Sequence, residues 1–478
     1  MKRLRDGLIA VVKRECPTCT LIVPVLRQLA GAAEPFTVYS QDDPAFPEGV
    51  GAVIDDRTLE ASFHLGVHTV PTLIRFRSGE ECARALGWNR PEWEATSGMK
   101  GLGPGLPENR PGCGSLTELP GMAHRLAARF ADVGLQSRRI AADPHADPIE
   151  VCYERGWSDG LPVTPPTPER VLAMLGGTTR SPKDVVGLIP PDLVECTVEK
   201  VAVNAVLAGC KPEYLPVVIA ALEAALMPAF GLHGVLCTTN AVAPVIMVNG
   251  PIARKIGMNA KGNVFGQGNR ANATIGRALQ LIVRNVGGGR PGEIDRACFG
   301  NPGKYTFCFA EDEDDGIWDS YAVEKGFSRE ASTVTLFTGD GVAPIIDQVS
   351  RSPEDLLRSY APCLRAIYNA SQVADVAAFL AIGPEHARVF HTAGWSKQKV
   401  KDALTALLRV PVRELKPGFG LDQDLQRLQR DDPEATVPKF KTGSLNVIRV
   451  GGSAGLFSAI ISGLGSITIN PVTREIKS

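Results

Sequence analysis

Two cysteines three positions apart, Cys16 and Cys19, are the residues of this chain whose type and spacing most directly indicate chemistry. They follow the apolar run 7–12 and precede the apolar segment 21–26, an order that predicts a strand, a turn and a helix. A thiol at a helix start meets free N–H groups and the positive end of the helix dipole, which lower its pKa. We therefore expect Cys16 to be an accessible thiolate and Cys19 to resolve its mixed disulfides.

The elements that must position these thiols are predicted from the hydrophobic pattern of residues 1–95. We expect one α/β unit, built in order from strand 7–13, helix 17–30, strand 36–40, helix 56–64 and strand 72–77. The last strand is entered through Val70-Pro71-Thr72.

With Cys-x-x-Cys opening the first helix and Val-Pro-Thr opening a later strand, residues 1–95 resemble the thioredoxin superfamily. The resemblance implies that Pro71 is cis and lies against the Cys-x-x-Cys turn, where it shapes substrate docking. Ala10 stands where thioredoxins often bury an aspartate, and Glu-Cys-Pro-Thr-Cys replaces the usual Trp-Cys-Gly-Pro-Cys, so redox potential and proton shuttling do not carry over. The alternatives are a domain used only for docking and, less favoured, half of a zinc site.

A third thiol, Cys113, lies between glycines in residues 96–144, which we expect to be a Gly- and Pro-rich linker with a helical segment. Gly112-Cys113-Gly114-Ser115-Leu116 resembles the motif of the UGSC proteins, in which selenocysteine precedes Gly-Ser-Cys. Cys113 would take the selenocysteine position and Leu116 that of the final cysteine. The resemblance implies a reactive thiol at 113, with Cys16 or Cys19 as its reductant. A plain linker cysteine is the alternative.

Residues 145–478 are expected to form a larger, C-terminal α/β domain. The segments 156–166 and 203–214 resemble UGSC-associated proteins, which places the domain in a family without giving it a reaction.

Two internal echoes suggest that this domain has two related halves, whose loops would face each other across a cleft. Residues 242–246 recur at 342–346, and Gly250-Pro251 has a looser partner in Gly383-Pro384. The two spacings differ, so chance similarity is the alternative.

Several residues of the large domain are candidates for substrate binding. Asn269, Arg270 and Asn272 lie in a glycine-containing helix start, 266–277, that could bind a carboxylate or phosphate, or could be a structural turn and cap. The remaining candidates are Asn204, Cys210, His386, His391 and Lys397.

His386 and Lys397 could serve in acid–base catalysis, although a surface helix with ordinary polar residues is the competing interpretation. His386 and His391 are five residues apart, which does not align two metal ligands on one helix face, and we expect no metal site and identify no cofactor. The acidic run 311–315 is expected to be a solvated loop.

Composition limits the classes of partner. With 478 residues and a net charge of −1, the chain gives no basis for binding nucleic acid or acidic membranes. It has no apolar run near the roughly 20 residues that span a bilayer and no secretory signal pattern, so we expect cytoplasmic residence. Eleven scattered cysteines do not suggest a disulfide scaffold. A homo-oligomer is possible, but nothing specifies one.

These observations predict a thiol-dependent oxidoreductase, in which the Cys-x-x-Cys head and Cys113 serve an α/β body acting on a small, anionic substrate. An electron-donating reductase or thiol would be its partner. One alternative is a non-redox lyase or hydrolase with a regulatory or protective head. The other is a redox-sensing binding protein.

Overall fold

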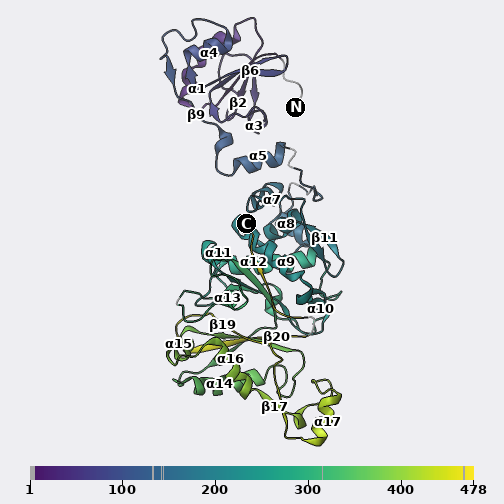
Figure 1. Ribbon diagram of the computed structural model, residues 1–478. Helices are drawn as coiled ribbons and strands as arrows, with labels where there is room; N and C mark the ends of the chain where they lie inside the picture. The colour runs from purple at the N-terminus through teal and green to yellow at the C-terminus, as the bar shows by residue number, and fades with distance from the viewer. Residues whose placement is uncertain are drawn as a thin grey trace. The chain divides into compact units, whose positions relative to one another are not determined.

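The computed structural model describes residues 6–131, 134–141, 143, 145–314, 316–466 and 469–477. The chain divides into two compact units, 1–135 with 168–172, and 136–167 with 173–478. Both combine helices with β-sheets, and the sheets contain parallel as well as antiparallel pairs, which confirms the predicted α/β class. Figure 1 shows the helices and strands of both units.

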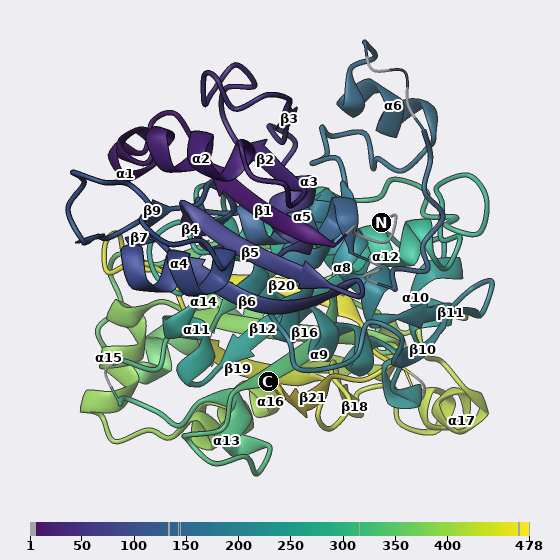
Figure 2. The same cartoon turned by 90° about the horizontal axis from the view of Figure 1, so that it is seen from above.

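The first unit is built on a five-stranded sheet in the order β3-β2-β1-β5-β6. Its strands are β1 (Gly7–Val12), β2 (Phe36–Ser40), β3 (Val53–Asp55), β5 (Thr72–Arg77) and β6 (Glu80–Leu86). The first three run parallel, whereas β5 is antiparallel to β1 and β6 to β5 (Figure 2). Every residue of β1 is buried, as its continuous apolar sequence predicts for a central strand.

The helices of this unit include α1 (Pro17–Leu21), α2 (Val23–Ala30), α3 (Glu60–His64), α4 (Arg90–Ser97), α5 (Met122–Phe130) and the first residues of α7 (Pro168–Leu175). The helix expected over 17–30 is interrupted at Ile22, which caps the end of α1 and the start of α2. Pro24 explains the break, because proline lacks the N–H that would continue the ladder and is tolerated only in the first turn of a new helix.

The segment expected to be a linker instead folds onto the first unit. Its strand β9 (Cys113–Gly114) pairs antiparallel with β4 (Thr69–Val70), and β8 (Asn109–Arg110) pairs with β7 (Trp88–Asn89). Glycine here permits close packing: a Cβ on Gly112 would come within 2.8 Å of the carbonyl oxygen of Val70. Gly- and Pro-rich composition therefore marks tight turns in this segment, not a tether.

The second unit contains two four-stranded sheets. One has the order β13-β12-β14-β21, with β12 (Ala243–Asn249), β13 (Cys308–Ala310), β14 (Thr333–Gly339) and β21 (Val472–Glu475). The other has the order β15-β20-β16-β19, with β15 (Val342–Ile346), β16 (Val376–Ile382), β19 (Leu445–Arg449) and β20 (Phe457–Leu464).

The two sheets repeat one pairing pattern. The central strand of each sheet is parallel to one neighbour, β12 to β13 and β16 to β19. It is antiparallel to the other neighbour, β12 to β14 and β16 to β20. That second neighbour pairs antiparallel with a fourth strand, β14 with β21 and β20 with β15. β12 and β16 both end at Gly-Pro and lead into helices α11 (Pro251–Lys255) and α15 (Pro384–Thr392). The echo between 250 and 383 thus marks equivalent positions, which supports two related halves. The echo between 242 and 342 does not, because it aligns β12 with β15.

The fourth strand of each sheet comes from the other half. β15 follows β14 in the chain but pairs with β20, and β21 follows β20 but pairs with β14. Between the sheets lies an apolar core in which the rings of Phe337 and Phe379 stack with centroids 3.7 Å apart. The exchange of strands and this shared core join the halves into one body.

Helices cover the outer faces of both sheets (Figure 1). On the first sheet lie α9 (Leu215–Ala225) and α12 (Arg270–Asn285), with α8 (Val198–Ala208) packed against both helices, and on the second lie α14 (Pro353–Arg365), α15 and α16 (Lys397–Leu407). The remaining elements of this unit include α6 (Pro148–Glu154), β10 (Val185–Ile189), β11 (Val194–Thr197), α10 (Leu232–Cys237), α13 (Tyr321–Glu324), β17 (Arg409–Pro411), α17 (Gln423–Asp431) and β18 (Thr436–Pro438).

Among the described residues, no helix by itself has the length and apolar character needed to cross a membrane. The bent pair Pro212–Ala225 and Pro228–Cys237 meets that test only when its two parts are joined.

Candidate functional site

Cys16 forms the N-cap of α1, where the backbone N–H of Cys19 points at its sulfur from 3.4 Å. The pKa of Cys16 falls from 9.0 to about 5, chiefly because the Cys19 thiol donates a hydrogen bond to the thiolate. Burial acts in the opposite direction, and the Cys113 thiol and the N–H groups of Cys19 and Thr18 lower the pKa further. The predicted thiolate is therefore supported, but neighbouring thiols contribute most to it.

Cys113 lies beside Cys16 because of the pairing between β4 and β9. That pairing places Cys113 opposite Val70, whose carbonyl oxygen is 3.5 Å from the Cys16 sulfur. The Val70–Pro71 bond is cis, as the resemblance implied, and Pro71 is buried. The structure thus brings together all four residues that the sequence nominated for thiol chemistry.

The exposure of the three thiols differs from expectation. Cys16 and Cys19 are both 0 % exposed, so the prediction of an accessible Cys16 is wrong. Cys113 is only partly buried and covers Cys16. Its hydrogen bond to the Cys16 thiolate raises the pKa of Cys113, and burial raises that of Cys19. The cluster therefore presents a protonated thiol in front of a buried thiolate.

Two hydrogen bonds hold the Cys113 segment against the start of α1. Thr18 Oγ1 donates to the carbonyl of Pro111 at 2.7 Å, and Lys13 Nζ donates to the carbonyl of Gly114 at 2.8 Å. Lys13 also favours the ionised form of Cys113 through its charge. These contacts fix the segment on both sides of the thiol.

A buried polar network supports the same segment from behind. Gln41, directly after β2, donates to Ser62 at 2.8 Å and to Ser115 at 2.7 Å, and accepts from the N–H of Leu116 at 3.1 Å. Ser62 in turn donates to Asp56 at 2.6 Å. Sequence reasoning missed this network. The only available signal was a glutamine at the end of a buried strand, which would not identify its partners.

In the second unit, Asn204 and Cys210 have structural contacts. Asn204 donates to the carbonyl of Lys200 and accepts from Asn285, both at 2.9 Å. Cys210 donates to the carbonyl of Thr274 at 3.4 Å, and burial raises its pKa to about 12, which disfavours a reactive thiolate.

The asparagines of segment 266–277 also have structural contacts. Asn269 caps α12 by accepting from the N–H of Asn272 at 3.0 Å, and the Asn272 side chain bonds both backbone groups of Asn259 at 3.0 and 2.9 Å. Arg270 is exposed and donates from Nε to the carbonyl of Gly209 at 3.0 Å. This geometry fits the turn-and-cap alternative.

The environments of the two histidine candidates, His386 and His391, differ from that of Lys397. His386 is fully buried, with its ring nitrogens 2.8 Å from Ser458 Oγ and 3.0 Å from the carbonyl of Asp347. His391 is exposed. His386 therefore packs as a core residue on the buried face of α15, and its hydrogen-bond partners are Ser458 and Asp347 instead of Lys397.

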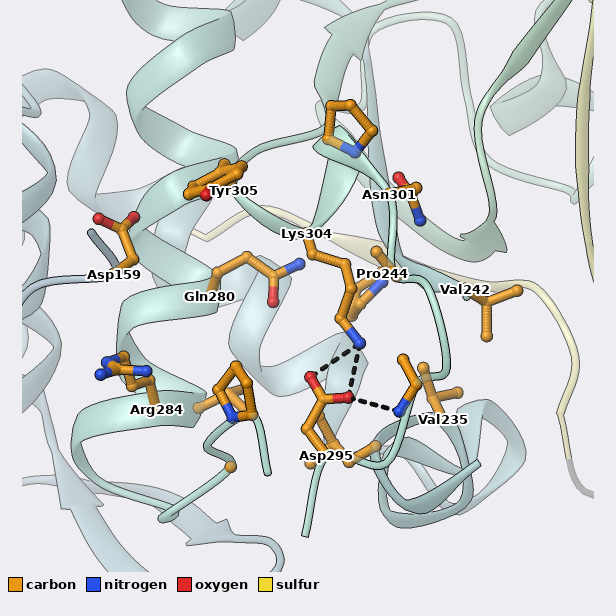
Figure 3. Close-up of a pocket in the computed structure, with 18 of the residues that line it drawn as sticks. Asp159, Val235, Val242, Pro244, Gln280, Arg284, Asp295, Asn301, Lys304 and Tyr305 are labelled. Atoms are coloured by element: carbon orange, nitrogen blue, oxygen red, sulfur yellow. Dashed lines mark hydrogen bonds and ion pairs between the residues drawn. The ribbon is translucent and has the colours of Figure 1, made fainter. Parts of the chain in front are cut away.

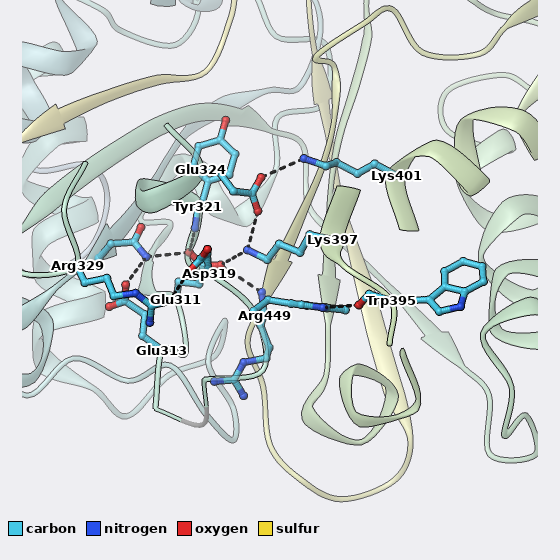
Figure 4. Close-up of polar contacts among 12 residues, drawn as sticks. Glu311, Glu313, Asp319, Tyr321, Glu324, Arg329, Trp395, Lys397, Lys401 and Arg449 are labelled. Atoms are coloured by element: carbon cyan, nitrogen blue, oxygen red, sulfur yellow. Dashed lines mark hydrogen bonds and ion pairs between the residues drawn. The ribbon is translucent and has the colours of Figure 1, made fainter. Parts of the chain in front are cut away.

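Lys397 instead occupies a buried ion-pair cluster at the start of α16 (Figure 4). Its Nζ lies 3.1 Å from both Glu311 and Glu324, and Lys401 binds Glu324 at 3.0 Å. Burial disfavours the ammonium, yet the two carboxylates raise the pKa of Lys397 above its ordinary value. The amine is therefore held charged, which does not suit a general base.

The acidic run was expected to be solvated, and this is wrong for Glu311 and Asp312, which are 4 % and 7 % exposed. Arg449 binds Asp312 at 3.1 Å, and its backbone N–H lies 3.5 Å from Glu311. The reason lies in the repeat: Glu311 follows β13 at the position equivalent to Arg449 at the end of β19. Opposite charges thus meet where the two halves join.

No group of three or more His, Cys, Asp or Glu side chains in the described ranges is arranged to hold a metal ion. No protein-family model matches the chain, and a search of curated proteins found no match either. The assignment of a site therefore depends on the residues and their geometry, which favour the three thiols of the first unit.

Proposed function

We propose that the first unit is a thiol–disulfide oxidoreductase whose outer thiol is Cys113 and whose inner thiolate is Cys16. The observation that carries this proposal is the pairing of β9 with β4 beside cis-Pro71, which sets Cys113 opposite Val70, whose carbonyl oxygen lies 3.5 Å from the Cys16 sulfur. A strand–turn–helix entry to Cys16 and a sheet with β5 antiparallel to β1 support the resemblance to the thioredoxin superfamily. The reactive role of Cys113 accords with its resemblance to the UGSC motif.

The reaction begins at Cys113, because it is the thiol of the cluster that solvent reaches. Its proton passes along the hydrogen bond to the Cys16 sulfur, and the Cys113 thiolate attacks one sulfur of a substrate disulfide. A mixed disulfide forms, and the departing substrate thiolate takes the proton from Cys16.

The Cys16 thiolate then attacks the Cys113 sulfur. The second substrate thiolate leaves and takes a proton from water, and a Cys16–Cys113 disulfide remains. Two electrons have passed from the protein to the substrate. Cys19, in contact with Cys16, can attack the Cys16 sulfur while its proton passes to the departing Cys113 thiolate, which leaves a Cys16–Cys19 disulfide and a Cys113 thiol. A low-molecular-weight thiol or a reductase restores the dithiol, which suits the reducing conditions of a cytoplasm.

The experiment is single-turnover reduction of a small aromatic disulfide by the pre-reduced full-length protein. Cys16→Ser and Cys113→Ser should each abolish formation of the second substrate thiol. Cys82→Ser and Cys363→Ser, which alter exposed cysteines outside the cluster, should react like the parent. Mass spectrometry of quenched samples should show substrate attached to Cys113 in the Cys16→Ser variant. Full turnover in both cluster variants would end the proposal.

Burial of Cys16 favours redox sensing as a second candidate. A small oxidant could reach Cys113 and produce the Cys16–Cys113 disulfide without any catalytic cycle. In that case the disulfide forms, but repeated turnover with excess reductant and substrate does not occur. The lyase or hydrolase alternative has less support, because His386 and Cys210 are buried with partners and Lys397 is ion-paired.

A further inference from the structure

We propose that a pocket of the second unit binds a small organic anion that carries an aromatic or other flat apolar group. The pocket encloses about 550 Å³ between α10, β12, α12 and the loop 289–305 (Figure 3). Volumes of this size are typical of small-molecule sites. The inference rests on the proposed function in one respect: it assumes that the second unit is the part of the protein that binds the substrate. The sequence predicted an anion site at Arg270, whereas this proposal places the anion site in the pocket.

The pocket carries an uncompensated positive charge. Asp159 is neutralised by two hydrogen bonds from Arg277, at 2.8 and 2.7 Å, and Lys304 is neutralised by Asp295, at 2.8 and 2.7 Å. Arg284 is the remaining charged lining residue, and no carboxylate in the described part of the chain forms an ion pair with it. The pocket therefore has a net positive charge.

The Arg284 side chain has an unsatisfied hydrogen-bond donor. Its Nε is buried and has no hydrogen-bond partner in the structure. A buried donor without a partner costs about 1–3 kcal/mol, and a carboxylate or phosphate bound by the guanidinium would remove that cost. Figure 3 shows Arg284 at the wall of the pocket, separate from the Lys304–Asp295 pair.

Much of the remaining pocket lining is apolar. Val235, Val242 and Pro244 line it, and Phe299 and Tyr305 also belong to its lining. Phe299 is 98 % exposed and Tyr305 is 45 % exposed, so both rings are free to stack on a flat ligand. An apolar wall with one unpaired cation selects a ligand that has an apolar body and one anionic group.

The test uses benzoate as probe, with acetate and benzyl alcohol as matched ligands that lack the ring or the charge. Binding to the reduced full-length protein is measured by isothermal titration calorimetry and by ligand-observed NMR. Benzoate should bind more tightly than either. Arg284→Gln should weaken benzoate by about tenfold or more and leave benzyl alcohol unchanged. Phe299→Ala should weaken benzoate and benzyl alcohol together.

Arg296→Gln is the matched control, because Arg296 is an exposed arginine of the same loop that does not line the pocket. It should bind benzoate like the parent. Equal loss in both arginine variants, or no loss in Arg284→Gln with unchanged thermal unfolding, would overturn the inference, as would no preference for benzoate over acetate. Disulfide reduction is measured on the same samples. If disulfide reduction requires Cys16 and Cys113 but benzoate does not bind, the pocket proposal is refuted and the proposed function stands.

Discussion

Cys113 lies close enough to Cys16 to affect its ionisation, because β9 pairs with β4 and sets Cys113 opposite Val70, whose carbonyl oxygen is 3.5 Å from the Cys16 sulfur. A thiolate is seldom stable at a fully buried position, because burial favours the neutral thiol. Here two thiols and backbone N–H groups converge on Cys16 and more than offset that effect. The low pKa of Cys16 is thus a property of the cluster.

The thiolate absorbance of the reduced protein should therefore appear with a midpoint near pH 5, from Cys16 alone. Cys19→Ala and Cys113→Ala should each raise this pKa, with Cys19→Ala having the larger effect, because each removes a hydrogen-bond donor. Cys113→Ser should raise it less, since a hydroxyl still donates. Ultraviolet titration measures all four proteins, with Cys82→Ala as control. An unchanged midpoint in Cys113→Ala would contradict the contact.

Folding stability of the reduced protein should reflect the same pKa. Because the folded pKa lies below the ordinary value of 9.0, the stabilisation contributed by Cys16 is complete above about pH 9 and is lost as the pH falls through about 5. Denaturant unfolding at several pH values should show this trend in the parent protein. In Cys16→Ala the corresponding part of the pH dependence should be absent.

Gln41→Ala should lower the free energy of unfolding by about 1–3 kcal/mol, because it removes the amide that donates to the buried Ser62 and Ser115 hydroxyls and accepts from the N–H of Leu116. It should also raise the pKa of Cys16, since the Cys113 segment loses its support. Gln398→Ala, on the exposed face of α16, is the control and should change neither quantity. If Gln41→Ala lowers the stability but leaves the pKa of Cys16 unchanged, the polar network does not support the thiol site.

Lys397→Met should destabilise the protein by about 3–5 kcal/mol, because it leaves buried Glu311 without a compensating charge. Chemical denaturation measures this against Lys441→Met, an exposed lysine for which about 0.5 kcal/mol or less is expected. Adding Glu311→Gln to Lys397→Met should recover part of the loss. No recovery would mean that Lys397 stabilises by packing instead.

Ending the chain after residue 466 should impair folding, because β21 covers the edge of β14. The N–H and C=O groups of β14 that pair with β21 would be unpaired, and exposed strand edges promote aggregation. Size-exclusion chromatography and thermal unfolding are the measurements. A chain ending after Ile476 keeps β21 and should behave as the parent does. A monomeric, cooperatively folding 1–466 chain would refute the role assigned to the exchanged strand.

Much of the first unit could be predicted from its sequence. The strands expected over 7–13, 36–40 and 72–77 and the helix start at Cys16 followed from local patterns, because apolar periodicity acts within a few residues, whereas the cis bond before Pro71 was implied by the resemblance to thioredoxins. The break at Ile22 also had a local cause, Pro24, although the expected helix ran through it. The sequence echo at 250 and 383 likewise marked the repeat of the second unit.

Other features depend on pairing between distant residues, which no local pattern specifies. The sequence determined that Cys16, Cys19 and Cys113 were candidates, but only the antiparallel contact of β9 with β4 decided that Cys113 covers Cys16. In the same way, the acidic run was visible, but whether Glu311 meets solvent or Lys397 was decided by how the two halves join. Burial determines whether each group is charged and whether solvent can reach it, and burial is a property of the folded chain.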